Sequence, residues 1–219
     1  MSASPSSSSG APLIGYREIA AAGTATGWFE TLYAEARAGR AEVPWDVPEA
    51  SAHLRDFPLP AGDGRRALVV GCGAGRDAEH LAAAGYETTA FDIAPTAIEL
   101  ARSRHAGSPV SYVVADLLDP PAGWHHAFDL VLESNNLQAL PAGLRARAIP
   151  AVGTFVAPGG TLLVLAAAAV AGEGDGPPWP LTREEIDAFA ADGLRQESVE
   201  HTATPDTRFP GRWRAVFRR

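Results

Sequence analysis

Short apolar runs alternate with amphipathic segments through most of the chain, and this pattern predicts alternating strands and helices. Continuous apolar runs predict strands over residues 66–71, 87–92, 110–115, 127–133 and 160–166. Helical spacing of apolar positions predicts helices over residues 75–84, 95–105, 142–150 and 182–191. Strands that alternate with helices form a parallel sheet with helices on both faces, and strands covered on both faces are apolar throughout.

The end of the chain departs from this alternation. Residues 194–201 and 213–218 predict two strands, and a loop with proline and glycine separates them instead of a helix. Two such strands pair antiparallel at one end of the sheet. We therefore expect one domain over residues 64–219, with a mostly parallel sheet and a reversed strand at its end.

The beginning of the chain also differs. Residues 16–22 and 27–38 predict two short helices that end at glycines, and the proline-rich residues 41–63 follow them. We expect residues 16–63 to form a helical lid or cap, and the serine-rich residues 1–15 to be a disordered tail.

A glycine-rich turn follows the first predicted strand of the sheet. Gly71, Gly73 and Gly75 alternate with small residues, and Asp92 ends the next predicted strand. Glycine has no Cβ, so the backbone can turn sharply there and approach a ligand closely. A carboxylate at the end of the second strand can accept both hydroxyls of a ribose. The strand, turn and helix together predict a nucleotide site; a tight turn with nothing bound is the structural alternative.

Charge and composition exclude several classes of protein. The net charge of −8 argues against broad nucleic-acid binding, which uses a basic surface. The chain has arginine and no lysine, which excludes a Schiff-base lysine and a phosphate-binding P-loop lysine.

Localisation also follows from composition. The longest apolar run, residues 161–171, predicts a strand running into a loop and falls short of the ~20 residues that span a bilayer. Residues 1–10 lack the basic start and apolar centre of a signal peptide, and the single Cys72 fits a reducing compartment. These features predict a cytoplasmic protein with no membrane partner; they do not predict an oligomeric state.

From about residue 66 onward, the chain resembles the class I S-adenosylmethionine-dependent methyltransferases. Five segments carry the resemblance: Val69-Val-Gly-Cys-Gly-Ala-Gly75, Phe91-Asp-Ile93, Val114-Ala-Asp-Leu117, Phe128-Asp-Leu-Val-Leu-Glu133 and Pro158-Gly-Gly-Thr-Leu-Leu-Val164. The resemblance implies a Rossmann-like, seven-stranded α/β sheet with an antiparallel last strand. It also implies S-adenosylmethionine as cofactor, held by Gly71, Cys72, Gly73, Gly75, Asp92, Ile93, Asp116 and Leu117.

A narrower resemblance is to the thiopurine, thiocyanate and halide methyltransferase group. It rests on the aromatic residues 28–33, on Pro44-Trp45-Asp46 and on Gly176-Pro-Pro-Trp-Pro-Leu-Thr182. The chain departs from this group at Ser134-Asn-Asn-Leu-Gln138, where anion-methylating members have aromatic and cysteine-containing patterns. This departure affects the prediction of the acceptor but not the prediction of the cofactor.

Several cofactor residues have structural alternatives. Asp92 is the candidate for the ribose, and its alternative is a cap for the helix that follows. Asp116 is the candidate for the adenine amino group, although Asp119 lies three residues later. Cys72 is expected to be a small packed side chain, because the sequence offers no histidine to activate it. Arg76 is expected to be solvated.

The end of the fourth predicted strand holds the acceptor candidates. Glu133 is a candidate to face the sulfonium or the methionine amino group, and its alternative is a strand-end charge in water. Asn135, Asn136 and Gln138 are candidates to position an acceptor, and their alternative is capping the next helix.

Aromatic side chains and histidines complete the set of candidates. The aromatic faces of Trp28, Phe29, Tyr33, Trp45 and Trp179 would attract a sulfonium or a planar acceptor, and packing is their alternative. His125 and His126 are surface residues or an acid/base pair; a metal would need further ligands at fixed spacing, which the sequence lacks.

The residues together favour methyl transfer from S-adenosylmethionine to a small-molecule acceptor, with a thiol or another soft nucleophile favoured. Methylation of an oxygen or nitrogen of a secondary metabolite is the alternative within this class. A nicotinamide-dependent oxidoreductase and a non-catalytic cofactor-binding protein are the alternatives outside it.

Overall fold

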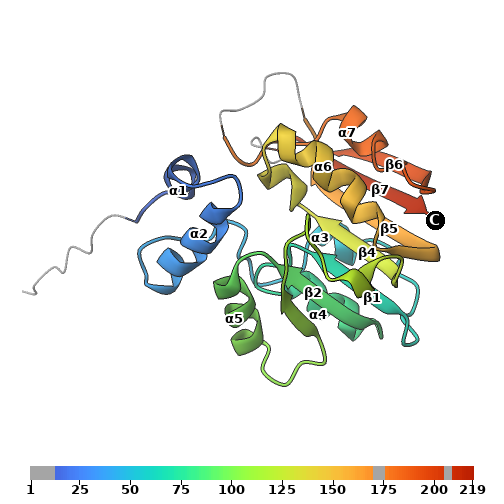
Figure 1. The fold of residues 1–219 in the computed structure, drawn as a ribbon, viewed down its shortest axis with the longest axis horizontal. Coiled ribbons are helices and arrows are strands. Elements are labelled where there is room, and N and C mark those ends of the chain that lie inside the picture. The colour runs from blue at the N-terminus through green and yellow to red at the C-terminus, as the bar shows by residue number, and fades with distance from the viewer. Residues whose placement is uncertain (1–12, 170–175, 205–208) are drawn as a thin grey trace, which may run out of the picture.

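The seven strands form a single sheet in the order β3-β2-β1-β4-β5-β7-β6 (Figure 1). The structure is a computed structural model and describes residues 13–169, 176–204 and 209–219. The strands are β1 (Arg66–Val70), β2 (Glu87–Asp92), β3 (Ser111–Val114), β4 (Phe128–Ser134), β5 (Val156–Ala167), β6 (Arg195–Ala203) and β7 (Gly211–Arg218).

The first five strands are parallel, and β7 is reversed. β1 pairs in parallel with both β2 and β4, while β7 pairs antiparallel with β5 and β6. This topology confirms the expected Rossmann-like sheet with an antiparallel last strand. The order also changes direction at β1, so the carboxyl ends of β1 and β4 flank a switch point where open α/β sheets bind ligands.

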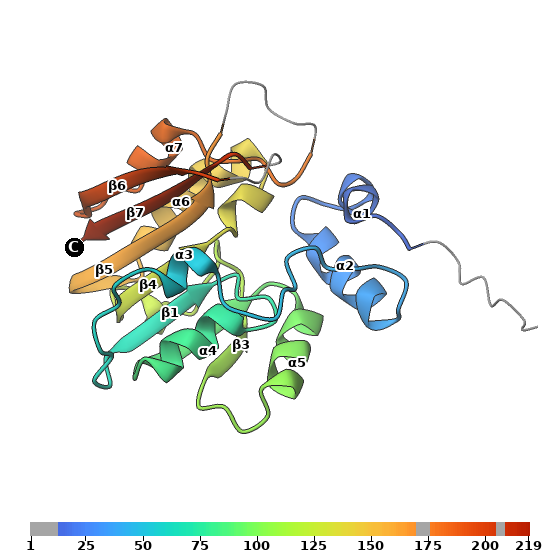
Figure 2. The ribbon, with the colours of Figure 1, turned by 180° about the vertical axis from the view of Figure 1, so that it is seen from behind.

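Helices cover both faces of the sheet, as expected. One face packs under α6 (Ala142–Gly153) and α7 (Arg183–Asp187), and the other under α4 (Arg76–Ala83) and α5 (Pro95–Arg104) (Figures 1 and 2). Two short 3₁₀ turns, η1 (Ala122–Trp124) and η2 (Leu137–Ala139), precede and follow β4. Apolar side chains along β1 and β5 alternate between the two cores, so each strand contributes to both.

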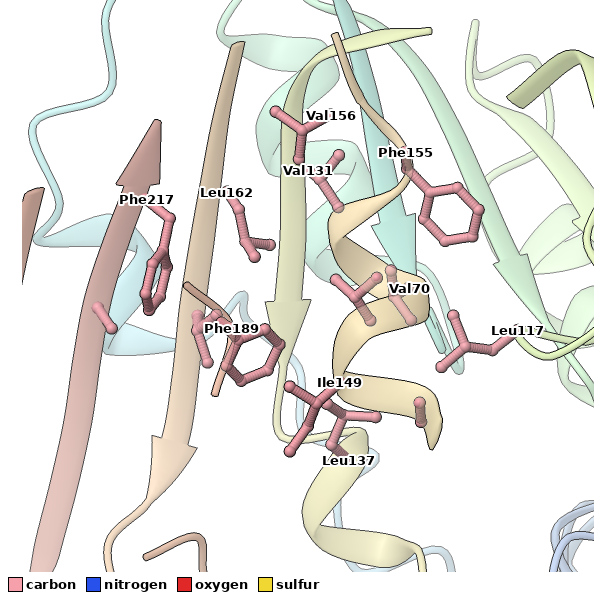
Figure 3. Close-up of a cluster of buried hydrophobic side chains, with 14 of the residues drawn as sticks. Val70, Leu117, Val131, Leu137, Ile149, Phe155, Val156, Leu162, Phe189 and Phe217 are labelled. Atoms are coloured by element: carbon pink, nitrogen blue, oxygen red, sulfur yellow. The ribbon is translucent and has the colours of Figure 1, made fainter. Parts of the chain in front are cut away.

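The core on the α6 side anchors the turn after β4. Leu137 of η2 is fully buried and points toward Ile149 of α6 (Figure 3). Burying a leucine of this size stabilises its position by about 2 kcal/mol. The residues just before Leu137, which were predicted to meet the acceptor, are therefore fixed by the core.

The N-terminal segment, residues 16–63, contains α1 (Tyr16–Ala22), α2 (Gly27–Arg37) and α3 (Ala52–Arg55). The first two helices match the prediction, but α3 lies in the proline-rich part where no helix was expected; Leu54 is fully buried and holds it against the sheet. Residues 1–12 of the predicted tail lie outside the described residues. Within the rest of that tail, Ile14 pairs with Ala41, which places the predicted tail boundary a few residues too late.

Three other boundaries differ from the predictions. β5 begins at Val156, four residues early, because Val156 already pairs with Phe128. α6 continues beyond Pro150 to Gly153, because Ile149 and Val152 on its inner face are buried in the core. α7 is shorter than expected and starts with a capping box between Thr182 and Glu185. The end of the apolar run over residues 161–171 lies outside the described residues, and no helix within the described ranges has the length and hydropathy to cross a membrane.

Candidate active site

A cavity of about 960 Å³ lies at the edge of the sheet where the parallel strands end. Its lining comes from the ends of β1, β2, β4 and β5, from the start of β7, and from the N-terminal segment. The ends of parallel strands meet at one edge, so residues far apart in sequence converge there.

The glycine turn forms part of this lining. Gly71 and Gly73 line the cavity with φ angles of 59° and 50°, in the left-handed region. A Cβ on Gly71 would lie 2.2 Å from the Asn136 side-chain oxygen, and one on Gly73 would lie 2.7 Å from the Tyr33 hydroxyl. Gly75 is outside the lining and caps the start of α4, where a Cβ would collide with Tyr112. Gly75 therefore shapes the turn at this position.

Asp92 lies beside the turn, where it caps the backbone that follows β2 and also lines the cavity. Its carboxylate accepts hydrogen bonds from Gly73 N and Ala94 N, each at 2.9 Å, and it also lines the cavity. Each carboxylate oxygen has two acceptor sites, so one remains on each oxygen for a ligand. Burial raises the pKa of Asp92, and the backbone N–H groups of Ala94, Gly73 and Ile93 oppose that rise.

The other cofactor candidates also lie at the cavity. Ile93 is half-buried beside Asp92, Leu117 is buried, and Asp116 is exposed; all three line the cavity. Asp116 uses one oxygen to accept a hydrogen bond from Leu118 N. Asp119 is not in the lining, so of the two acids only Asp116 is placed to meet a ligand.

Cys72 lines the cavity as a half-buried side chain and packs against the core on the α4 side. Burial raises the pKa of its thiol well above the ordinary value, and the negative charge of Asp92 adds to the rise. The thiol is therefore protonated at neutral pH and is a packing group, as expected.

The prediction that Glu133 faces the cofactor is wrong. The side chain is fully buried and is not in the cavity lining. Its carboxylate accepts hydrogen bonds from Leu137 N at 2.6 Å and Asn136 N at 3.4 Å. Burial raises the pKa of Glu133 to about 7, against the opposing effect of these backbone donors. Glu133 thus caps the turn after β4, and the alternative of a charge in water is also wrong.

Asn135 and Asn136 line the cavity together with Gln138. Asn135 adopts a left-handed φ of 59°, and its side-chain oxygen accepts a hydrogen bond from Arg212 at 3.3 Å. The side chain of Asn136 stands against Gly71. Gln138 is buried and accepts a hydrogen bond from Ala167 N at 2.7 Å, which ties the turn to β5.

The aromatic candidates fall into two groups. Trp28, Phe29, Tyr33 and Trp45 all line the cavity, whereas Trp179 does not. The rings of Trp28 and Phe29 stack with centroids 4.1 Å apart, and Trp45 meets Trp28 edge to face.

Arg76 is not solvated, contrary to expectation. It lines the cavity and pairs with Asp46 at 2.6 Å, and the same carboxylate pairs with Arg104 of α5. The Arg104 and Arg76 guanidinium groups lower the pKa of Asp46. The Pro-Trp-Asp segment is thereby fastened to the start of one core helix and the end of another.

The structure also corrects the assignment of His125. Both His125 and His126 precede β4, and the backbone N–H of His126 bonds to Thr154 at the amino edge of the sheet. Seven residues of β4 separate them from the cavity edge, a length of about 20 Å. An acid/base role for His125 in the cavity is therefore wrong.

Two residues that bear on the chemistry of the cavity were not identified from the sequence. His53 of α3 and Arg212 of β7 both line it. Burial lowers the pKa of His53, and the positive charges of Arg212 and Arg214 lower it further. No sequence motif points to either residue. His53 lies in a proline-rich segment where no helix was expected, and the pattern around Arg212 predicts only a strand.

Comparison with known proteins identifies the core of the chain. Residues 67–160 match the model of a family described as a methyltransferase domain. These residues include the glycine turn, Asp92 and Asp116. The match and the seven-stranded sheet with its reversed strand agree with the resemblance to the class I S-adenosylmethionine-dependent methyltransferases.

Individual methyltransferases resemble this chain over part of its length. The ubiquinone biosynthesis O-methyltransferase of Xanthomonas campestris is 36% identical over 103 residues, which cover 46% of this chain and 42% of that protein. A probable thiol methyltransferase of Arabidopsis thaliana is 30% identical over 129 residues, 56% of each chain. These matches thus span about half the length of the relatives. The structure of the N-methyltransferase NodS from Bradyrhizobium japonicum, in complex with S-adenosyl-L-homocysteine, superposes with a TM-score of 0.66 at 22% identity, over 86% of this chain and 98% of that one.

The residues at the cavity fit S-adenosylmethionine. Gly71 and Gly73 leave a cradle that a Cβ would fill, and Asp92 keeps acceptor sites beside it. Within the described ranges, charged side chains of both signs line the cavity: the acids Glu49, Asp77, Asp92 and Asp116 and the arginines Arg17, Arg76 and Arg212.

Proposed function

We propose that the protein transfers the methyl group of S-adenosylmethionine to a small molecule, with a thiol or another soft nucleophile as the favoured acceptor. The position of Asp92 is the main support for this proposal. Two backbone N–H groups at 2.9 Å hold its carboxylate at the glycine turn, and the carboxylate lines the cavity. In this proposal the carboxylate binds the ribose diol, and Asp116 and Leu117 border the adenine.

When bound, S-adenosylmethionine supplies a methyl group on a positively charged sulfur, and the acceptor's lone pair forms the new bond as the carbon–sulfur bond breaks and its electrons go to sulfur. The chain's task is to align the acceptor in line and to exclude water. Alignment can lower such a barrier by ~7–11 kcal/mol in favourable cases. In the proposed role, Asn135 and Asn136 orient the acceptor, and the N-terminal segment covers the cavity.

A thiol is favoured because thiols lose their proton to solvent near neutral pH without a strong base. The partial match to a probable thiol methyltransferase supports this choice. Methylation of a hydroxyl is the second candidate, and two observations favour it. A ubiquinone biosynthesis O-methyltransferase matches a similar segment, and His53, whose pKa is lowered, is a neutral base in the cavity.

The cofactor assignment is tested by calorimetry with S-adenosylmethionine and S-adenosylhomocysteine. We expect Asp92→Ala to weaken binding at least about tenfold, because a hydrogen bond to a charged group contributes about 1.5–3 kcal/mol. The matched control, Asp119→Ala, removes an acid outside the cavity and should leave the affinity unchanged. Unchanged affinity in Asp92→Ala would refute the ribose assignment, and tighter binding of NADH would favour an oxidoreductase.

The acceptor is tested with a panel of thiols and phenols and mass-spectrometric detection of methylated products. Faster methylation of thiols than of phenols of the same shape is expected. Phenols as the better substrates would favour the second candidate. Cofactor binding without any methylation would favour a non-catalytic cofactor-binding protein.

A further inference from the structure

The cavity has two halves, because its lining follows the order of the strands. The glycine turn, Asp92 and Asp116 lie over β1, β2 and β3. Asn135 and Arg212 lie over β4 and β7, on the other side of the switch point. We call these the cofactor half and the acceptor half, and the inference about the acceptor half rests on the proposed function.

The cavity is large for a pocket that holds a single ligand. Its volume of about 960 Å³ is at the upper end of the roughly 300–1,000 Å³ of a pocket that holds one drug-sized molecule. A cofactor bound over β1 to β3 would leave the acceptor half open.

The walls around that space are apolar and include flat faces. They come from separate elements: Phe29, Leu140, Leu144, Pro178 and Phe209. Arg145 fixes part of this wall, since it is buried, pairs with Glu185 at 2.6 Å and donates to the carbonyl oxygens of Leu140 and Trp179. An apolar ligand that covers this fixed wall removes apolar surface from water, and that burial favours binding.

The acceptor half contains a cation, Arg212, beside the amide side chain of Asn135. Arg212 donates a hydrogen bond to Asn135 at 3.3 Å, and Asn135 is adjacent to Asn136, whose side chain stands against Gly71 of the cofactor half. An anionic group beside Arg212 and Asn135 would therefore be close to the boundary between the halves. Burial lowers the pKa of His53, and the positive charges of Arg212 and Arg214 in the same region add to that lowering.

We propose that the acceptor half binds a planar, mainly apolar molecule of one or two fused rings, whose hydroxyl or thiol is held as an anion next to Arg212 and Asn135. A positive charge within a few ångströms favours the ionised form of an acidic group, so Arg212 raises the fraction of reactive anion. Thiocyanate or a halide would satisfy the charge but would leave the apolar walls uncovered. A long flexible thiol would lose rotational freedom against flat walls, and that loss would lower its affinity.

The test uses 4-nitrophenol, whose anion is yellow, with the full chain saturated by S-adenosylhomocysteine so that no turnover occurs. We expect saturable binding and an apparent pKa of the bound phenol that is lower by about one unit. Arg212→Gln should abolish the shift and weaken binding about tenfold. The control Arg218→Gln removes an exposed arginine at the far end of the same strand and should change binding less than about twofold.

A second variant tests the shape of the acceptor half. Leu144→Trp places a larger side chain in the apolar wall and should weaken 4-nitrophenol binding about tenfold, while the affinity for S-adenosylhomocysteine is unchanged. Thiocyanate and iodide should not compete with the phenol at equal concentration.

The outcomes separate this inference from the proposed function. Tight S-adenosylhomocysteine binding without phenol binding, or phenol binding that neither variant weakens, would overturn the acceptor class alone. Effective competition by thiocyanate would also overturn it and indicate a small-ion site. Failure to bind S-adenosylhomocysteine would instead overturn the proposed function.

Discussion

The indole Nε1 of Trp45 donates a hydrogen bond to the hydroxyl of Tyr33 at 3.0 Å, above the glycine turn. This bond joins α2 to the Pro-Trp-Asp segment and puts a phenol against Gly73. Burial raises the pKa of Tyr33 far above its ordinary value, and Asp92 adds to the rise, so the hydroxyl keeps its proton.

Removing that hydroxyl tests the contribution of the bond to stability. We expect Tyr33→Phe to lower the free energy of unfolding by about 1–2 kcal/mol, because it leaves a partly buried indole N–H without its partner. Tyr16→Phe is the control, since the Tyr16 hydroxyl accepts an exposed contact from Arg17. Urea denaturation of both variants measures the difference, and equal losses would contradict the assignment.

The Asp46 carboxylate is expected to fasten the N-terminal segment through its two arginines. Asp46→Asn should lower the free energy of unfolding by about 1–2 kcal/mol, because Asp46 and Arg76 are only 22% and 16% exposed. The Arg37–Glu99 pair is 63% exposed on both sides, so Glu99→Gln should have little effect. Thermal unfolding checks both variants, and limited proteolysis should cut residues 41–63 faster in Asp46→Asn than in Glu99→Gln.

Substitutions at two glycines separate a steric effect from a backbone effect. Gly71 and Gly107 both have left-handed φ angles, 59° and 86°, but only Gly71 would clash, with Asn136. Gly107→Ala should therefore cost about 1 kcal/mol of stability and leave cofactor affinity unchanged. Gly71→Ala should in addition weaken S-adenosylhomocysteine binding at least about tenfold. Calorimetry that finds equal affinities would show that the turn does not approach the cofactor.

The burial of Glu133 predicts a dependence of stability on pH. Its carboxyl has a pKa of about 7 in the fold against 4.5 for the free group. The native state therefore favours the protonated form, and this contribution is full below the unfolded pKa and is lost as pH rises through 7. Relative to Glu133→Gln, the native protein should gain up to about 3 kcal/mol between pH 8 and pH 5. Denaturant midpoints of the two proteins at both pH values measure the gain. A difference between the midpoints that does not change with pH would show that burial does not raise the pKa of Glu133.

Local sequence patterns were sufficient for most of the fold. Strand and helix positions follow from the apolar runs and their spacing, and the reversed last strand follows from two strands with no helix between them. The glycine turn and Asp92 were also identified, because both lie on one continuous strand–turn–helix–strand segment.

The sequence was a poor guide wherever a residue's role depends on what surrounds it. Glu133 was predicted to face a ligand, since strand ends generally do, but the backbone of its own turn folds back and takes both oxygens. Arg76 was expected in water, and only the docking of Asp46 from 30 residues earlier buries it. His125 has chemistry suited to catalysis but lies at the wrong edge of the sheet.

By itself, the sequence determined the class of sheet, the glycine turn and the acid that follows it, because short-range periodicity and spacing encode them. Only the tertiary structure decided which polar groups share the cavity, since Asn135 and Arg212 are 77 residues apart and meet only when β7 inserts beside β5. Contacts between residues so far apart in the sequence depend on the packing of the whole sheet, which no local sequence pattern encodes.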